Sequence, residues 1–109
     1  MKTGTFRTYK GDNALSIAIY PPLDYTGAQY LPLTPDRQTF FAKKADEIDE
    51  AEYEKQYRER VLSKLDANEI YKRFQQSVLL CWEDAGEFCH RRIVAEWLEL
   101  NLGIRVDEL

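Results

Sequence analysis

The chain has 109 residues, of which 44% are hydrophobic, and its formal net charge at neutral pH is −4. This length and apolar content predict a single folded domain over residues 1–109, with one modest core. The acidic balance argues against a protein that coats nucleic acid non-specifically, which needs an excess of lysine and arginine.

Leu15–Tyr20 is an apolar run that predicts the first well-defined strand, and Pro21 and Pro22 end it sharply. Residues 1–14 before it are polar and predict only a short strand or an extended arm. Residues 24–32 after it read as a loop whose tyrosines cover the core.

A first helix is predicted to begin at Thr34-Pro35-Asp36, with an N-cap, a proline at the first helical position and an early acid. Phe40 and Phe41 are expected to anchor it. Lysines follow near its end, where they suit the helix dipole.

Two further helices are predicted by capping pairs, which place an aspartate three residues before a glutamate. The second helix opens at Asp49 and the third at Asp66. The second carries an apolar and aromatic stripe at four-residue spacing, which predicts a face packed on the sheet or on another helix. The stripe consists of Tyr53, Tyr57, Val61 and Leu65.

Val78–Trp82 is a second uninterrupted apolar run, which predicts a strand covered on both faces. Residues 83–88 form a polar loop with a conformationally free Gly86. A helix begins near Cys89 or His90, and Ile93 and Trp97 on its apolar face are expected in the core.

Gly103 is suited to end that helix, and residues 104–109 can form a last short strand. The predicted fold is therefore α/β: a small, mostly parallel sheet flanked by helices, in the order strand-helix-helix-helix-strand-helix-strand. Leu15–Tyr20 and Val78–Trp82 should be neighbouring parallel strands, because helices connect them.

The loop and helix after Val78–Trp82 hold both cysteines and the only histidine of the chain. Ligands of open parallel sheets bind outside the carboxyl ends of the strands, beside helix N-termini. There Cys89 is favoured as a thiolate nucleophile, and His90 and Glu83 are candidate acid–base groups. We therefore expect the catalytic residues, if any, to be these three.

Arg91, Arg92 and Trp82 are the candidate binding residues, since two arginines in a first helical turn suggest a nearby negative charge. The predicted ligand is anionic: a phosphorylated small molecule, a nucleotide or a nucleic-acid end. The structural alternative is that the arginines pair with acids of the preceding loop, and we expect Glu83 within reach of one of them.

These residues carry a family resemblance. LLCWE, a short acidic loop and FCHRRIVAEWL resemble the signature of the bacterial and viral domain-of-unknown-function family 488, and the likeness extends upstream through SIAIYPP, GAQYLPLTP and EYEKQYRERVLSKLD. The resemblance implies a compact α/β domain from about Leu15 onward, and it brings neither an established activity nor a cofactor.

Three other interpretations remain open. Cys81, Cys89, His90 and Glu83 offer zinc-type ligands, but their spacing matches no zinc motif, so we expect no metal and no cofactor. A Cys81–Cys89 redox pair ranks lower, because the spacing does not resemble Cys-x-x-Cys. A non-enzymatic regulatory module that binds a protein partner is the main alternative function.

The cellular setting follows from two cysteines, no secretion signal and no apolar run of membrane-spanning length. These features predict a cytoplasmic, reduced protein without membrane contact.

Overall fold

A five-stranded parallel sheet forms the centre of the molecule, in the strand order β3-β2-β4-β1-β5. The computed structural model describes every residue from 1 to 109. The strands are β1 (Lys2–Thr5), β2 (Ala14–Ser16), β3 (Ala28–Gln29), β4 (Val78–Cys81) and β5 (Asp107–Glu108). The helices are α1 (Arg37–Lys44), α2 (Glu50–Arg60), α3 (Ala67–Phe74) and α4 (His90–Leu102), with short 3₁₀ turns at Leu31–Leu33 and Leu62–Lys64.

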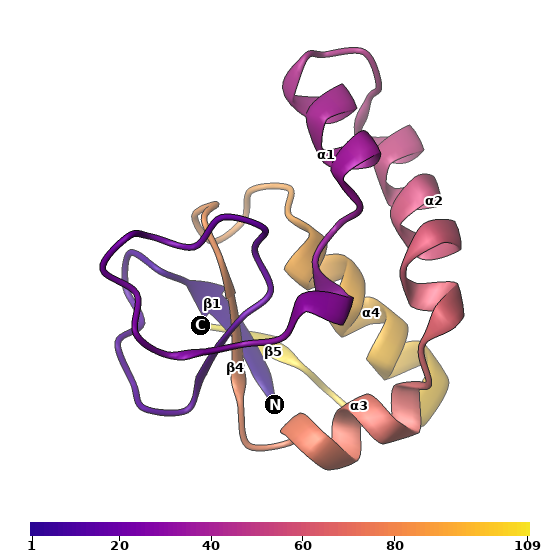
Figure 1. Cartoon of the computed structure of the whole chain (residues 1–109). Helices are drawn as coiled ribbons and strands as arrows, with labels where there is room; N and C mark the ends of the chain where they lie inside the picture. Colours follow the sequence, from indigo (N-terminus) through magenta and orange to yellow (C-terminus); the bar gives the residue numbers. More distant parts are fainter.

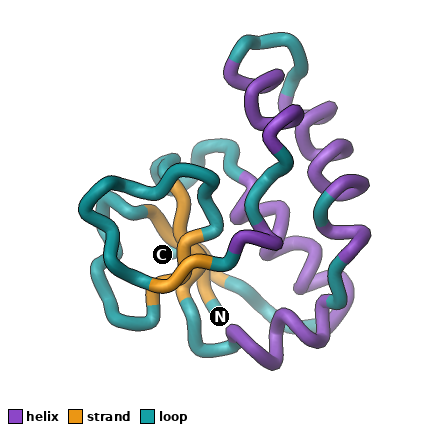
Figure 2. Tube along the Cα trace, viewed as in Figure 1, coloured by secondary structure: helices purple, strands orange, loops and turns teal.

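The helices cover one face of the sheet, and loops cover the other (Figures 1 and 2). Leu15 and Leu79 belong to the core on the helical side. Val78 and Leu80 alternate with Leu79 along β4 and pack in a second cluster with Phe6. This alternation explains the continuous apolar run in β4, because both faces of that strand are buried. The predicted α/β class with a small parallel sheet is confirmed.

The predicted pairing of the two apolar runs is also confirmed. Ala14–Ser16 lies parallel to Val78–Leu80, and the register continues one bond further where the Ile17 amide donates to the Leu80 carbonyl at 3.1 Å. The first strand is nevertheless shorter than predicted, since residues 17–20 leave the sheet after that bond. They run instead along the cleft described below.

The polar N-terminal segment forms the strand β1, which lies between β4 and β5 inside the sheet. Its buried threonines replace the usual apolar side chains, and their hydroxyls are satisfied. Thr3 Oγ1 donates to Glu108 Oε1 at 2.6 Å, and Thr5 Oγ1 donates to the Trp82 carbonyl at 3.3 Å. An interior position for this segment was not predicted, because it lacks the hydrophobic pattern of a buried strand.

Two of the three predicted helix caps are confirmed. Asp49 Oδ1 accepts from the Glu52 amide at 2.8 Å, and Asp66 caps α3 in the same manner. The first helix begins later than predicted, because Asp36 is the residue whose carboxylate accepts from the Thr39 amide at 3.1 Å.

The expected anchors of α1 are only partly correct. Thr39 is the buried residue of this helix, Phe40 is half-buried, and Phe41 is 50% exposed. The prediction that Phe41 anchors the helix is therefore wrong. The reason is visible in Figure 1, where α1 and the start of α2 extend away from the sheet and leave one side of α1 uncovered.

Helix α4 begins and ends as predicted. Cys89 is its N-cap residue, and Gly103 ends it with a φ of 65°, which a residue with a side chain rarely adopts. Ile93 is buried as expected, whereas Trp97 is only partly buried at the edge of the core. The prediction that Trp97 is a core residue is thus only partly correct, because Trp97 packs against the core without being enclosed by it. No helix of this fold combines the length and apolar character needed to cross a membrane.

The first turn of α4 is fixed to the edge of the sheet by a buried ion pair. Arg91 has no exposed side-chain surface, and its guanidinium donates to Glu108 at 2.7 and 3.0 Å. Burial by itself raises the pKa of the Glu108 carboxyl, but hydrogen bonds from Arg91 and Thr3 outweigh it and hold that pKa below its usual range. The pair therefore remains ionised at neutral pH.

Removing the carboxylate should be strongly destabilising, because it leaves a guanidinium buried without its counter-charge. We expect Glu108→Ala to lower the free energy of unfolding by about 3 kcal/mol in urea denaturation. Asp107→Ala is the matched control from the same strand, since its partner Arg105 is 85% exposed, and a change within about 0.5 kcal/mol is expected there. Equal effects of the two substitutions would contradict the structural role of the buried pair.

Candidate functional site

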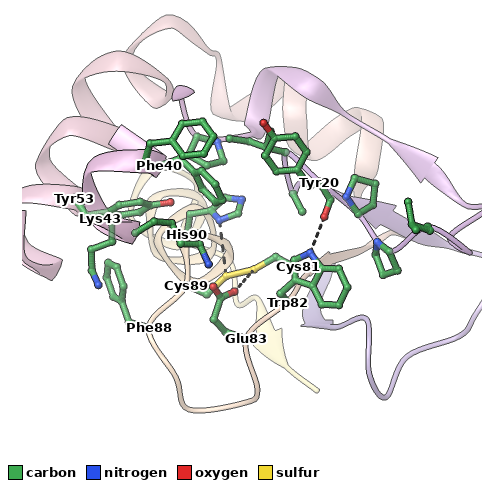
Figure 3. Close-up of a pocket in the computed structure, with 18 residues that line it drawn as sticks. Tyr20, Phe40, Lys43, Tyr53, Cys81, Trp82, Glu83, Phe88, Cys89 and His90 are labelled. Carbon is green, nitrogen blue, oxygen red and sulfur yellow. Dashed lines mark hydrogen bonds between the residues drawn. A yellow bond between two sulfur atoms is a disulfide. The ribbon is translucent and has the colours of Figure 1, made fainter. Parts of the chain in front are cut away.

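A cleft of about 780 Å³ opens beside the carboxyl ends of β2 and β4, next to the N-terminus of α4 (Figure 3). Most of its lining is apolar and aromatic, and a few polar and charged groups are grouped within it. The lining side chains used below are Tyr20, Phe40, Lys43, Lys44, Tyr53, Cys81, Trp82, Glu83, Phe88, Cys89 and His90. This is the edge of a parallel sheet at which ligands bind in open α/β folds.

Four segments of the chain form the walls of this cleft, one of them α2 through Tyr53. The other three are residues 18–23 after β2, residues of α1, and the segment from the end of β4 to the start of α4. Pro21 and Pro22 belong to the segment after β2 and line the cleft, but they do not end the strand as predicted, because β2 already ends at Ser16. Their position follows from the early exit of the chain from β2.

The two cysteines are joined in a disulfide between the end of β4 and the start of α4. Cys81 is the last residue of β4 and Cys89 is the N-cap of α4, so the chain path brings the two sulfurs together. Gly86, with a φ of 88°, helps the seven-residue loop between them to reverse direction. Sequence analysis ranked this pairing low, because the spacing of two cysteines does not show whether the loop between them brings the chain back to the same place.

His90 lines the cleft on the side of the core, and its hydrogen bonds define which ring nitrogen carries the proton. Its Nε2–H donates to the Ile17 carbonyl at 2.7 Å, which leaves the lone pair of Nδ1 directed toward Cys89 Sγ at 3.8 Å. Burial, opposed by the hydrogen bond to the Ile17 carbonyl and assisted by the nearby Arg91 charge, lowers the pKa of His90 to about 4. His90 is therefore neutral at physiological pH, and its Nδ1 can accept a proton from a free Cys89 thiol.

Glu83 and Trp82 lie at the other end of the disulfide. Glu83 Oε2 is 3.1 Å from Cys81 Sγ, and its charge adds to burial in raising the pKa of Tyr53 above its ordinary value. Trp82 is 43% exposed, and its ring is held by a hydrogen bond from Nε1 to the Tyr20 carbonyl at 2.6 Å. Both side chains line the cleft, as Figure 3 shows.

Arg91 and Arg92 are oriented away from the cleft. Arg91 contacts Glu108, the Asp84 carbonyl and Cys81 Sγ, while Arg92 Nη1 donates to Thr3 Oγ1 at 2.8 Å and to the Val106 carbonyl at 3.0 Å. The expected contact of Glu83 with either arginine is absent. The reason is helical geometry, because successive residues of α4 are rotated by about 100° and these two are directed toward β1 and β5.

Trp82 was predicted as a binding residue and does line the cleft, whereas Lys43, Lys44, Phe40, Tyr53 and Phe88 were not recognised as site residues in the sequence. The two lysines were attributed to the dipole of their own helix, and Tyr53 to helix packing. No local signal distinguishes these roles, since α1 meets the β4–α4 loop only through the tertiary fold. The cleft thus gains two cations that replace Arg91 and Arg92 as its positive charges.

The donor atoms of Cys81, Cys89 and His90 lie within 4.8 Å of one another, with Glu83 beside them. Residue types of this kind suit zinc. The disulfide, however, bonds the two sulfurs to each other, so that neither is a thiolate ligand. Cys81, Cys89 and His90 can therefore bind a metal together only after the disulfide is reduced.

Residues 16–102 match the family model DUF488-N3a, which is described as the active DUF488-N3 subclade. The chain belongs to this family. The match includes β4, the disulfide, His90 and the α1 wall of the cleft, and it leaves out only the segments at the two ends. No curated protein matches the chain, and neither does any solved structure.

The lowered pKa of His90 predicts a specific loss of stability in acid. In the unfolded chain His90 titrates near 6.5, so the unfolded state binds the extra proton between pH 6.5 and about 4. The stabilisation is therefore complete above pH 6.5 and is lost as the pH falls through that window, by about 3 kcal/mol in total.

The comparison that isolates this effect is urea denaturation of the wild type and His90→Gln at pH 7.5 and pH 4.5. Glutamine does not titrate and retains a donor for the Ile17 carbonyl. We expect a steeper loss of stability in the wild type than in the variant. Parallel pH profiles would mean that folding leaves the pKa of His90 unchanged.

Proposed function

We propose that the cleft binds an anionic ligand that carries a planar ring, such as a nucleotide or a nucleic-acid end, and that reduced Cys89 acts on it as a nucleophile. His90 takes the thiol proton, and Glu83 is the further acid–base group of the site. The observation that carries this proposal is the convergence of Cys89, His90 and two lysines on one cleft. The description of the matched family as an active subclade agrees with it.

The anionic part of the ligand is assigned to Lys43, Lys44 and the N-terminus of α4. Arg91 and Arg92 are fully engaged at the sheet edge, so they serve this site by holding the helix in place. The amide groups at the beginning of an α-helix lack intrahelical partners, and the helix dipole is positive there. Two ammonium groups and this helix end together provide a cationic environment in a protein of net charge −4.

The planar part of the ligand is assigned to the aromatic walls. Trp82 presents a partly exposed ring that is already fixed by its bond to Tyr20. Phe40 and Phe88 line the cleft on the other sides. A ring held before binding loses little conformational freedom on stacking, and a nucleobase stacked on an aromatic side chain gains about 1–3 kcal/mol.

The chemical step is assigned to the Cys89–His90 dyad. A neutral His90 with its lone pair toward the sulfur is in the state required of a general base. The helix N-terminus at Cys89 favours the thiolate that results. Because burial disfavours the imidazolium, we expect proton transfer to accompany nucleophilic attack, with no stable thiolate–imidazolium pair in the resting enzyme.

A protein-binding module without enzymatic activity is the second candidate. It is favoured by exposed apolar side chains around the mouth of the cleft, namely Tyr20, Leu23 and Phe41. A partner segment could occupy the cleft with an apolar side chain there. In that case the two cysteines and His90 would serve packing and capping.

Alkylation of the reduced protein separates these two functions. After reduction with dithiothreitol, we expect Cys89 to react with iodoacetamide faster than Cys81 at neutral pH, as measured by peptide mass spectrometry. Inorganic phosphate at about ten times its dissociation constant should slow the reaction of Cys89 about tenfold, because the bound anion covers the sulfur.

The double substitution Lys43→Ala/Lys44→Ala should remove this protection. Lys72→Ala, which removes an exposed lysine of α3 outside the cleft, should leave it unchanged. Sodium chloride at equal ionic strength controls for screening. Equal slow rates at both thiols, with no effect of phosphate, would favour the protein-binding module.

A further inference from the structure

The disulfide lies within the proposed catalytic site, where a purely structural bridge would block its nucleophile. Both sulfurs line the cleft, and each has its own polar neighbours. We propose that Cys89 and Cys81 form a reversible two-cysteine couple that reduces hydroperoxides, with Cys89 as the attacking thiol and Cys81 as the resolving thiol. This activity goes beyond the proposed function, since it requires no anionic ligand.

The surroundings of Cys89 suit the attacking role. Its sulfur lies at the N-terminus of α4, and His90 Nδ1 is 3.8 Å away with a free lone pair. The hydrogen bond from His90 Nε2 to the Ile17 carbonyl holds the ring in this tautomer. A peroxide in the cleft therefore meets a sulfur that has a proton acceptor beside it and a helix end that favours negative charge.

The surroundings of Cys81 suit the resolving role. The buried guanidinium of Arg91 donates to Cys81 Sγ at 3.3 Å, which stabilises negative charge on that sulfur. Glu83 Oε2 lies 3.1 Å from the same sulfur and is placed to take its proton. Arg91 has this contact in addition to Glu108, so the ion pair that fixes α4 also serves the second thiol.

Both sulfurs are carried by the ends of regular elements that the core holds in place. Cys81 ends the central strand β4, and Cys89 begins α4, whose following turns are buried through Ile93 and Val94. An oxidised Cys89 is consequently generated beside its resolving partner. The couple can close without unfolding the loop between the two elements.

The reaction balances as two steps. In the first, the Cys89 sulfur attacks the terminal, hydrogen-bearing oxygen of the hydroperoxide ROOH, an S–O bond forms and the O–O bond breaks. The departing alkoxide takes the proton that His90 received from the thiol, which gives Cys89 sulfenic acid and the alcohol ROH.

In the second step, the Cys81 sulfur passes its proton to Glu83 and attacks the Cys89 sulfur. The S–S bond forms, the S–O bond breaks, and hydroxide leaves as water with the proton from Glu83. The sulfurs are oxidised by two electrons and the peroxide is reduced. An external dithiol restores the couple by thiol–disulfide exchange and becomes a disulfide itself.

The redox state of the two cysteines also controls the nucleophile of the proposed function. This regulatory consequence rests on the proposed function. In the disulfide form Cys89 has no thiol to offer to a ligand in the cleft. Peroxide therefore switches the nucleophile off, and a dithiol switches it on.

The test uses the full chain, reduced with dithiothreitol and freed of it under nitrogen. One equivalent of hydrogen peroxide is added, and thiols, peroxide and peptide masses are followed with time. The chain has only two cysteines, so each thiol is assigned without ambiguity. We expect one peroxide to be consumed per chain, both thiols to be lost together, and the Cys81–Cys89 disulfide to form.

The single substitutions separate the two roles. In Cys81→Ser, oxidation should stop at a Cys89 sulfenic acid that dimedone traps. In Cys89→Ser, the loss of the Cys81 thiol should be at least about tenfold slower, because only Cys89 combines the neighbouring His90 base with a position at a helix N-terminus. Circular dichroism establishes that each variant is folded. Cys81→Ala provides a second replacement at the buried position, which, unlike serine, is apolar.

Three results would overturn the couple: unchanged peroxide consumption in Cys89→Ser, sulfinic acid in the wild type without a disulfide, or stoichiometric zinc on the reduced protein. The last would make the cysteines and His90 metal ligands. Because this assay contains no anionic ligand, its failure is distinct from that of the proposed function. Loss of phosphate protection with intact peroxide reduction would remove the proposed function alone.

Discussion

The geometry of the cleft depends on the buried guanidinium of Arg91. It joins α4 to β5 through Glu108, to the β4–α4 loop through the Asp84 carbonyl and to β4 through the Cys81 sulfur. An ionised group without water needs all of its partners, so these contacts must form together. The first turn of α4 is thereby fixed relative to the sheet edge, and Cys89 and His90 are fixed with it.

The first turn of α4 thus contributes to the cleft with one side and anchors the helix to the sheet edge with the other. Cys89 and His90 are directed to the cleft, while Arg91 and Arg92 are directed to β1, β5 and the loop. A helical turn allows this division because successive side chains point about 100° apart. Charge that sequence analysis assigned to ligand binding is used to position the helix. The cleft receives its cations from α1 instead.

Much of the fold was predictable from local pattern. The two apolar runs, the caps at Asp49 and Asp66 and the glycine that ends α4 were identified because each follows from neighbouring residues alone. The central β1 was not identified. Its buried threonines are polar, and only their hydrogen bonds to distant partners make the position stable.

The sequence by itself determined the fold class and located Cys89, His90 and Glu83 in one loop and helix start. Only the tertiary structure decided the partners of those residues: the disulfide, the Ile17 carbonyl that sets the His90 tautomer, and the lysines of α1 across the cleft. The physical reason is the distance along the chain over which each interaction acts. Caps, turns and hydrophobic periodicity act over a few residues, whereas burial, ion pairing and the pKa of a core histidine depend on groups that folding brings together from remote parts of the chain.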